Sequence, residues 1–224
     1  MANKGPLIIN YYDGDEDFVK APEGLFGESD ECGVIIDLET TGLLAGKDKI
    51  IEMALVQFRF DKSTGEVTKV LSRDDFLQDP GVPLPALIVA LTGLTDEKLK
   101  GQEINKKRVN EILEQSSLVI AHNAAFDRGF MHKNFPASDK CFWACSKDDI
   151  EWREKGFSCR VQQHLCKDHG FYYDGHRAEI DCMALLKLID AYCHQQPING
   201  LQCFVAMGFA AQTLQHIEDK FPAL

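Results

Sequence analysis

Two acidic residues follow an apolar run in the stretch GVIIDLETTGLL, residues 33–44. Asp37 and Glu39 are two positions apart, so in a β-strand both side chains point to the same face near its carboxyl end. Neighbouring carboxylates repel each other, and a hard divalent cation with oxygen ligands would compensate both charges. For an isolated pair, an exposed strand end with the acids close to Lys47 or Lys49 is the simpler explanation.

Two later segments support the metal-site explanation. In VIAHNAAFD, residues 119–127, a short apolar strand leads into a helix with Asp127 in its first turn. In YYDGHRAEID, residues 172–181, His176 lies in a glycine-containing loop and Asp181 in the first turns of the next helix. Taken alone, Asp127 could simply interact favourably with the helix dipole, and His176 could have a structural role. The combined order, D-x-E, H-N-x-x-F-D and H-x-x-x-x-D, predicts one shared site.

The segments between these acids must form the elements that position them. Strands are predicted at 33–37, 49–60 and 67–78 as an antiparallel meander with a hairpin turn in DKSTGEV, and at 117–122 and 141–146. Helices are predicted at 86–95, 104–116, 123–135, 148–156, 160–170 and 178–195. Asn123 is expected to cap the third of these helices. The fold class is therefore α/β, a mixed sheet of a three-strand antiparallel meander and parallel strands, flanked by helices.

Charge is distributed unevenly along the chain. The formal net charge of −11 argues at first against a polyanionic partner, but residues 1–32 alone contribute −6. Residues 1–30 lack sustained periodicity and are expected to form an acidic N-terminal arm, mobile or loosely docked. Residues 31–196 are expected to form the main domain, and 197–224 a C-terminal helical extension packed on it.

Cysteine usage and hydropathy bear on the cellular setting. The eight cysteines are spread along the chain without a C-x-x-C pair or a block of metal ligands. The first residues lack a basic region followed by a long apolar one, and no window of 18 residues is apolar. We therefore expect a reduced, cytoplasmic protein with no membrane partner.

The motifs DLETTGL, HNAAFD and HRAEID, with the connecting PGVPLPALIVALTGLTDEKLKG, resemble those of the DnaQ-like DEDDh 3′–5′ exonucleases. This family includes the proofreading subunit of the bacterial replicative polymerase, and the resemblance covers roughly residues 33 to 195. It implies an RNase H-like fold with residues 31–196 as the exonuclease domain. The related class with tyrosine in place of the histidine is disfavoured, because Arg177 stands where that tyrosine would be.

The resemblance also assigns roles to individual residues. The metal ligands would be Asp37, Glu39, Asp127 and Asp181, holding two Mg²⁺ or Mn²⁺ ions, with His176 as general base. The terminal nucleotide would contact Thr40, Thr41, Gly42, Leu43, His122 and Asn123. For the threonines a simple turn, and for His122 a hydrogen bond within the core, are equally good explanations.

The implied activity is removal of nucleoside monophosphates from 3′ ends of single-stranded nucleic acid, with DNA favoured. Two alternatives remain at this point: a catalytically idle module of the same fold that binds nucleic acid, and an RNA-trimming exonuclease of the oligoribonuclease kind. The choice of sugar rests on contacts to the 2′-hydroxyl, which the sequence does not reveal. A polymerase partner and self-association are both possible.

Overall fold

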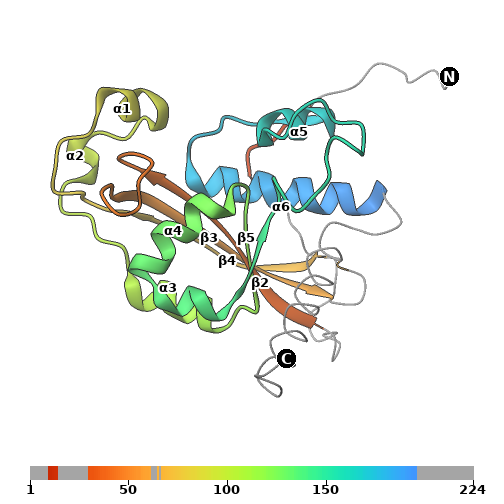
Figure 1. The fold of residues 1–224 in the computed structure, drawn as a ribbon, viewed down its shortest axis with the longest axis horizontal. Coiled ribbons are helices and arrows are strands. Elements are labelled where there is room, and N and C mark those ends of the chain that lie inside the picture. The colour runs from red at the N-terminus through yellow and green to blue at the C-terminus, as the bar shows by residue number, and fades with distance from the viewer. Residues whose placement is uncertain (1–9, 15–29, 62–64, 66, 196–224) are drawn as a thin grey trace, which may run out of the picture.

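A computed structural model of the chain describes residues 10–14, 30–61, 65 and 67–195 (Figure 1). Its main feature is a five-stranded sheet in the order β4-β3-β2-β5-β6. The strands are β2 Asp30–Thr40, β3 Ile50–Asp61, β4 Val67–Leu77, β5 Leu118–Ala121 and β6 Phe142–Cys145. The pairs β2–β3 and β3–β4 are antiparallel, whereas β2–β5 and β5–β6 are parallel. The predicted mixed α/β sheet, an antiparallel meander plus parallel strands, is confirmed.

Helices cover both faces of this sheet (Figure 1). The helices are α1 Ala86–Thr92, α2 Asp96–Leu99, α3 Lys106–Glu114, α4 Ala124–Asn134, α5 Gln162–Asp168 and α6 Ala178–Gln195, with a short 3₁₀ helix at Pro136–Lys140. On one face Ile35 packs with Cys182 and Leu186 of α6. On the other, Val34 and Ile36 pack with α3 and α4. Strand β2 is thus buried on both sides, as its unbroken apolar run predicts.

This packing decides the direction in which the acids of β2 point. Side chains alternate along a strand, so Asp37 and Glu39 continue the face of Ile35, which is the face covered by α6. In the register, Asp37 lies opposite Ala54 and Glu39 opposite Glu52, and the ladder is irregular between Glu39 and Thr40. The sheet therefore presents both carboxylates to the first turns of α6.

One predicted helix is absent from the structure. Residues 148–156 form a series of turns between β6 and α5. The cause is tertiary: Trp152 is fully buried, its indole N–H donates to the Ser146 carbonyl at 2.7 Å, and its ring packs edge-on against Phe157. Burying the indole and satisfying its N–H stabilises these turns more than the helical propensity of the segment stabilises a helix. The helix prediction for this segment is wrong.

The N-terminal arm is partly described. Residues Asn10–Tyr11 form strand β1, which pairs in parallel with strand β7, Phe171–Tyr172, in a separate two-stranded sheet. Sequence periodicity predicts neither of these strands. The division of the chain into an arm, a domain and an extension stays a prediction, and 197–224 lies outside the described residues.

Cysteine and membrane predictions can be compared with the described ranges. The six cysteines whose side chains the structure describes are free thiols. None of the helices in this part of the chain is long and apolar enough to cross a bilayer.

Candidate active site

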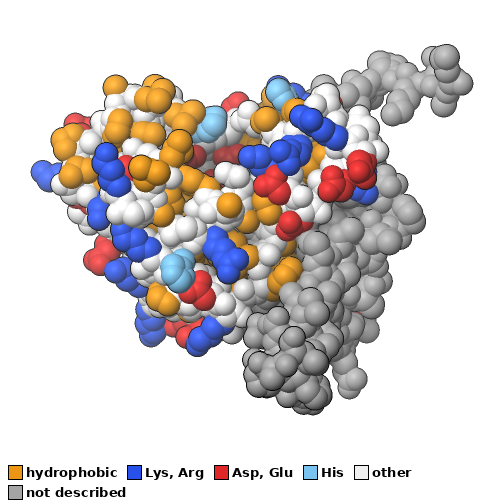
Figure 2. All heavy atoms as spheres, in the orientation of Figure 1, with side chains coloured by type: hydrophobic (Ala, Val, Ile, Leu, Met, Phe, Trp, Pro, Cys, Tyr) orange, Lys and Arg blue, Asp and Glu red, His pale blue; other side chains and the backbone are white. Residues whose placement is uncertain are grey.

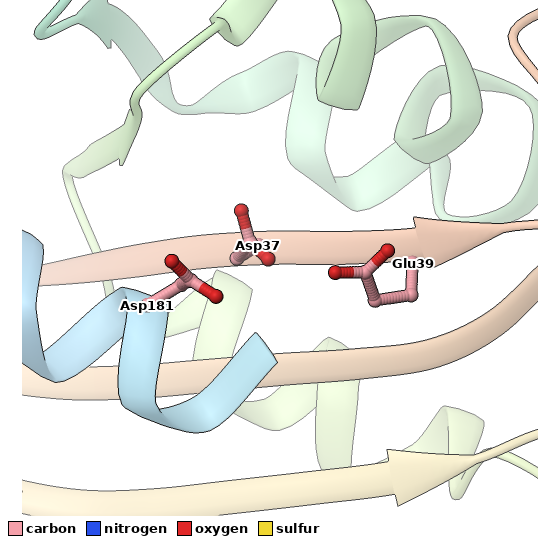
Figure 3. Close-up of side chains that lie close together, drawn as sticks. All are labelled: Asp37, Glu39 and Asp181. Atoms are coloured by element: carbon pink, nitrogen blue, oxygen red, sulfur yellow. The ribbon is translucent and has the colours of Figure 1, made fainter. Parts of the chain in front are cut away.

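Three carboxylates meet where β2 passes the start of α6 (Figure 3). Asp37 and Glu39 come from the strand and Asp181 from the first turn of the helix, and one oxygen of each lies within 4.8 Å of the others. Figure 3 shows Asp181 extending from α6 toward the two acids of β2. Residues more than 140 positions apart in the chain therefore share one small volume, as the combined motifs predict.

The fourth predicted ligand, Asp127, lies in the first turn of α4, and only 4% of it is exposed. The backbone amides of Asp127 and Leu38 lie close enough to the carboxylate to lower its pKa. Burial, assisted by the nearby charge of Glu39, raises the pKa of Asp127 to about 7. This acid lines the same pocket as the other three, although it is outside their 4.8 Å cluster.

Burial and mutual repulsion raise the pKa values of the whole group. The pKa of Asp37 lies well above its usual range because of burial and then the charges of Asp127, Asp181 and Glu39. Burial, with Asp181 and Glu52 beside it, raises the pKa of Glu39 to about 7. Without a cation the cluster therefore holds protons near neutral pH. An all-oxygen donor set of this charge fits hard divalent cations such as Mg²⁺ or Mn²⁺.

These acids line a pocket of about 500 Å³, which also contains His122, Asn123 and His176. Acidic side chains are visible in the hollow between the regions of α1 and α5 in Figure 2. Lys147 and Arg160 lie on the wall of the same pocket, so it combines a strongly acidic part with two cations. A pocket of this size accommodates a small polar ligand or the end of a chain.

His176 lies in the loop before α6, exposed and on the lining of the pocket. Its φ of +69° is in the left-handed region, and it is the one non-glycine residue in the described part of the chain that has a positive φ. A side chain in this conformation costs about 1–2 kcal/mol. Its backbone N–H donates to Asp181 Oδ2 at 2.8 Å, which stabilises the strained conformation and links the two residues.

A family model described as Exonuclease, RNase T, matches residues 34–189. The chain belongs to the RNase T exonuclease family. Its resemblance to DnaQ-like 3′–5′ exonucleases and its prediction as a nuclease, a hydrolase, are thereby confirmed.

Two curated relatives are bacterial polymerases. DNA polymerase III PolC-type of Halalkalibacterium halodurans is 40% identical over 104 residues, 46% of this chain and 7% of that protein. The PolC-type polymerase of Listeria monocytogenes is 39% identical over 101 residues, 44% of this chain and 6% of that protein. The match thus spans less than a tenth of these relatives.

Solved structures share the fold. An E. coli ExoI complex with single-stranded DNA has a TM-score of 0.65 at 16% identity, over 84% of this chain and 45% of that one. Exonuclease X in complex with 5′ overhanging duplex DNA has a TM-score of 0.58 at 22% identity, over 77% of this chain and 98% of that one. These similarities confirm the RNase H-like sheet of the exonuclease domain.

Two residues that the sequence analysis missed orient Asp181. Tyr173 donates its hydroxyl hydrogen to Asp181 Oδ1 at 2.7 Å, and Gln162 Nε2 donates to the Tyr173 hydroxyl at 2.8 Å and to the Asp181 carbonyl at 2.9 Å. The amide nitrogen of Gln162 can only donate, so the Tyr173 hydroxyl oxygen accepts from it. The hydroxyl hydrogen of Tyr173 is then free to donate to the Asp181 carboxylate. Both Asp181 oxygens thus accept a hydrogen bond from the protein. The sequence signal for Tyr173 was its position in the YYDGH stretch, close to His176.

Glu52 is a third residue that the sequence analysis passed over. It is fully buried on β3, opposite Glu39, and its Oε1 accepts from Arg177 Nε at 2.8 Å. Arg177 Nη2 also lies 3.6 Å from Asp75 Oδ2. A glutamate within the apolar run KIIEMAL was the sequence signal. The arginine next to His176 is therefore tied to two acids of the sheet, and it partly offsets the raised pKa of Glu39.

The last residue of β2 and the turn after it contain four of the predicted substrate residues, and none of the four lines the 500 Å³ pocket. Thr40 Oγ1 donates to the Gly42 carbonyl at 2.6 Å, and Thr41 Oγ1 accepts from the Lys49 amide at 3.0 Å. Leu43 is 80% exposed. The threonine hydroxyls thus stabilise the turn, and Leu43 projects into solvent beside the site.

His122 and Asn123 do line the pocket, but their polar atoms have partners in the protein. Burial lowers the pKa of His122 to about 4, so the ring is neutral. Its Nε2 donates to the Arg160 carbonyl at 2.8 Å, which leaves Nδ1 to accept from Ser146 Oγ at 2.9 Å. Asn123 occupies the N-cap position of α4, as predicted, but its side chain makes no capping bond: its Oδ1 accepts from Lys147 Nζ at 3.3 Å instead.

Proposed function

We propose that the chain is a 3′–5′ exonuclease that removes nucleoside monophosphates from single-stranded nucleic acid, with DNA favoured over RNA. The main support is a single pocket in which four acids with raised pKa values lie beside a histidine. Such a group is costly to bury unless cations and a charged substrate compensate it. The preference for DNA is supported by the relatives, since the ExoI and Exonuclease X structures contain DNA.

We propose Asp37, Glu39, Asp127 and Asp181 as the ligands of two Mg²⁺ or Mn²⁺ ions. When bound, such ions supply charge compensation for the scissile phosphate and lower the pKa of a nearby water. The protein itself holds the ligands in place: the backbone of β2 sets the positions of Asp37 and Glu39, and two hydrogen bonds fix the Asp181 carboxylate. This proposal is supported by a donor set made only of carboxylate oxygens.

We propose that His176 is the general base and takes a proton from the attacking water on a ring nitrogen. Its exposed place on the pocket lining leaves the imidazole accessible to water and substrate. Leu43, an exposed apolar side chain four residues after Glu39 in the sequence, suits stacking on the terminal base. Thr40, Thr41 and Gly42 would then shape the turn that presents it, and His122 and Asn123 would form the opposite wall.

The remaining proposals concern the wider protein. We propose residues 31–196 as the exonuclease domain, supported by the family match at 34–189. The PolC-type relatives support a polymerase as a partner, although the matching region is a small part of those proteins. A reduced, cytoplasmic setting is supported by the six free thiols of the described ranges.

The test is digestion of matched DNA and RNA single strands, labelled at the 5′ end, with Mg²⁺, Mn²⁺ or a chelator. We expect DNA to shorten from its 3′ end in the presence of metal only. Asp37→Ala should abolish the reaction, and His176→Ala should lower turnover by roughly 10²–10⁴-fold. Glu154→Ala, an exposed acid outside the pocket, is the control and should retain full activity.

Each alternative gives a distinct result in this assay. Faster digestion of RNA would favour the oligoribonuclease-like enzyme. Binding of the strands without any cleavage would favour the idle module. Undiminished cleavage by purified Asp37→Ala would contradict the assignment of the acidic cluster.

A further inference from the structure

The described part of the N-terminal arm docks directly beside the catalytic loop. The Asn10 amide donates to the Gly170 carbonyl at 2.9 Å, and the Tyr12 amide donates to the Tyr172 carbonyl at 2.8 Å. These two bonds frame the parallel pairing of β1 with β7. Within the described residues β7 has no other strand partner. The backbone of β7 therefore depends on the arm for its sheet hydrogen bonds.

Side chains anchor the same contact. Tyr12 is only 5% exposed and joins the core next to Phe171, with 5.7 Å between ring centroids in an edge-to-face arrangement. Lys187 of α6 places its ammonium 4.8 Å from the centroid of the Tyr12 ring, within the range of a cation–π interaction. Tyr11 packs edge-on against Tyr172 at 5.3 Å. The arm thus contacts both β7 and α6.

Gly14 extends this contact to the first turns of α6. It has a φ of +90°, and a Cβ added there would lie 3.0 Å from Cδ1 of Ile180. Asp13 and Gly14 share a small pocket with Glu179, Ile180 and Met183. The segment Asn10–Gly14 therefore runs along the residues that flank Asp181.

The elements contacted by the arm lead straight into the proposed active site. Tyr172 is the last residue of β7, Tyr173 is the donor to Asp181, and His176 follows three residues later. Gly175 packs closely on the Gln163 side chain, so this short loop has little room to shift without disturbing its neighbours. A displacement of β7 would therefore move both the orienting tyrosine and the histidine.

We infer that Asn10–Gly14 is a positioning element of the nuclease, with Tyr12 as its main positioning residue, and that it holds the 172–177 loop in its catalytic conformation. The inference rests on the proposed function for its catalytic consequence. Ordering a loop costs conformational entropy. Because pairing with β1 orders the loop before substrate binds, substrate binding does not have to supply that free energy.

The test is a double-mutant cycle of Tyr12→Ala with His176→Ala in the full chain. We expect Tyr12→Ala to lower kcat on the order of 10- to 100-fold with little change in KM, because the histidine is misplaced. In the His176→Ala background the same change should lower kcat by a smaller factor, because only the path through Tyr173 and Asp181 is left. Tyr12→Phe, which keeps the buried ring, should rescue kcat.

Val109→Ala, a buried truncation on α3, is the matched control for lost stability. It should lower the thermal midpoint and leave kcat unchanged below the unfolding range. An equal loss of kcat from Tyr12→Ala in both backgrounds would mean that the arm does not position His176. No loss in either background would mean that the loop does not need the arm. Both outcomes overturn the inference.

Hydrogen exchange provides a readout that does not depend on activity. Asn10→Pro removes one backbone bond of the β1–β7 pair and leaves the Tyr12 ring in place. It should accelerate exchange of the His176 amide relative to amides of β3, and unchanged exchange would refute the inference. If the wild-type chain has no nuclease activity, the proposed function fails, whereas the exchange result still decides whether the arm orders the loop.

Discussion

Replacing Glu39 with glutamine should stabilise the metal-free protein at alkaline pH. Glu39 lies among acids, and its pKa is raised from 4.5 to about 7, mainly by burial and then by Asp181 and Glu52. The folded state therefore binds the Glu39 proton more tightly than the unfolded state does. Its contribution to stability is full below pH 4.5 and is lost as the pH rises through 7. Glutamine keeps the shape of the side chain and has no charge to bury.

The size of the effect follows from the change in pKa. One pKa unit corresponds to about 1.4 kcal/mol, so ionising Glu39 in the folded protein at pH 8 costs at most about 3 kcal/mol. The side chain is partly exposed, and solvent screening reduces this cost to about 1–2 kcal/mol. Glu39→Gln should therefore raise the free energy of unfolding by about 1–2 kcal/mol at pH 8 and change it little at pH 4.

The assay is urea unfolding in the presence of a chelator, at pH 4 and pH 8, followed by tryptophan fluorescence. Glu154→Gln serves as the control, since Glu154 is exposed and outside the pocket, and it should change stability at neither pH. Excess Mn²⁺ should then stabilise the wild type more than Glu39→Gln, because the variant lacks a ligand. Equal stability of wild type and Glu39→Gln in chelator at pH 8, or a less stable variant, would refute the electrostatic argument.

Two further substitutions test the surroundings of the acids. Tyr173→Phe removes the hydrogen bond to Asp181 Oδ1 and should weaken Mn²⁺ binding 10- to 100-fold in calorimetric titrations; unchanged affinity would show that this bond does not orient the ligand. Gly42→Ala places a Cβ 2.7 Å from the Asp48 carboxylate, which accepts from the Leu44 amide at 2.8 Å, so it should destabilise the turn by about 1 kcal/mol and raise KM. Gly46→Ala has no atom within 4 Å of the new Cβ and is its control; equal effects of both would contradict a specific clash.

The sequence predicts most of the sheet and its flanking helices, because their signals are local. The apolar run before Asp37 specifies a buried strand, and helical periodicity places α6 at 178–195, as in the structure. Where local signals compete with tertiary contacts, prediction fails. The 148–156 segment has no helix-breaking residue before Gly156, and the burial of Trp152 turns it into a set of turns.

In the candidate site, too, local sequence signals identify some residues and miss others. The spacing of the acids and His176 names five residues, and the structure brings all five to one pocket, although their roles stay predictions. The partners that hold them are not visible in any local pattern. Arg177 and Glu52 are 125 positions apart, and the donor to Asp181 is a tyrosine that lies outside the helix carrying this acid.

The sequence by itself determined which residues can bind cations and move a proton, since those properties belong to the side chains and to their order at strand ends and helix starts. Only the tertiary structure decided how the carboxylates are oriented, that Arg177 reaches Glu52 and Asp75, and that residues 10–12 pair with β7. The physical reason is that periodicity reports which face of an element is buried. It does not report which distant segment covers that face.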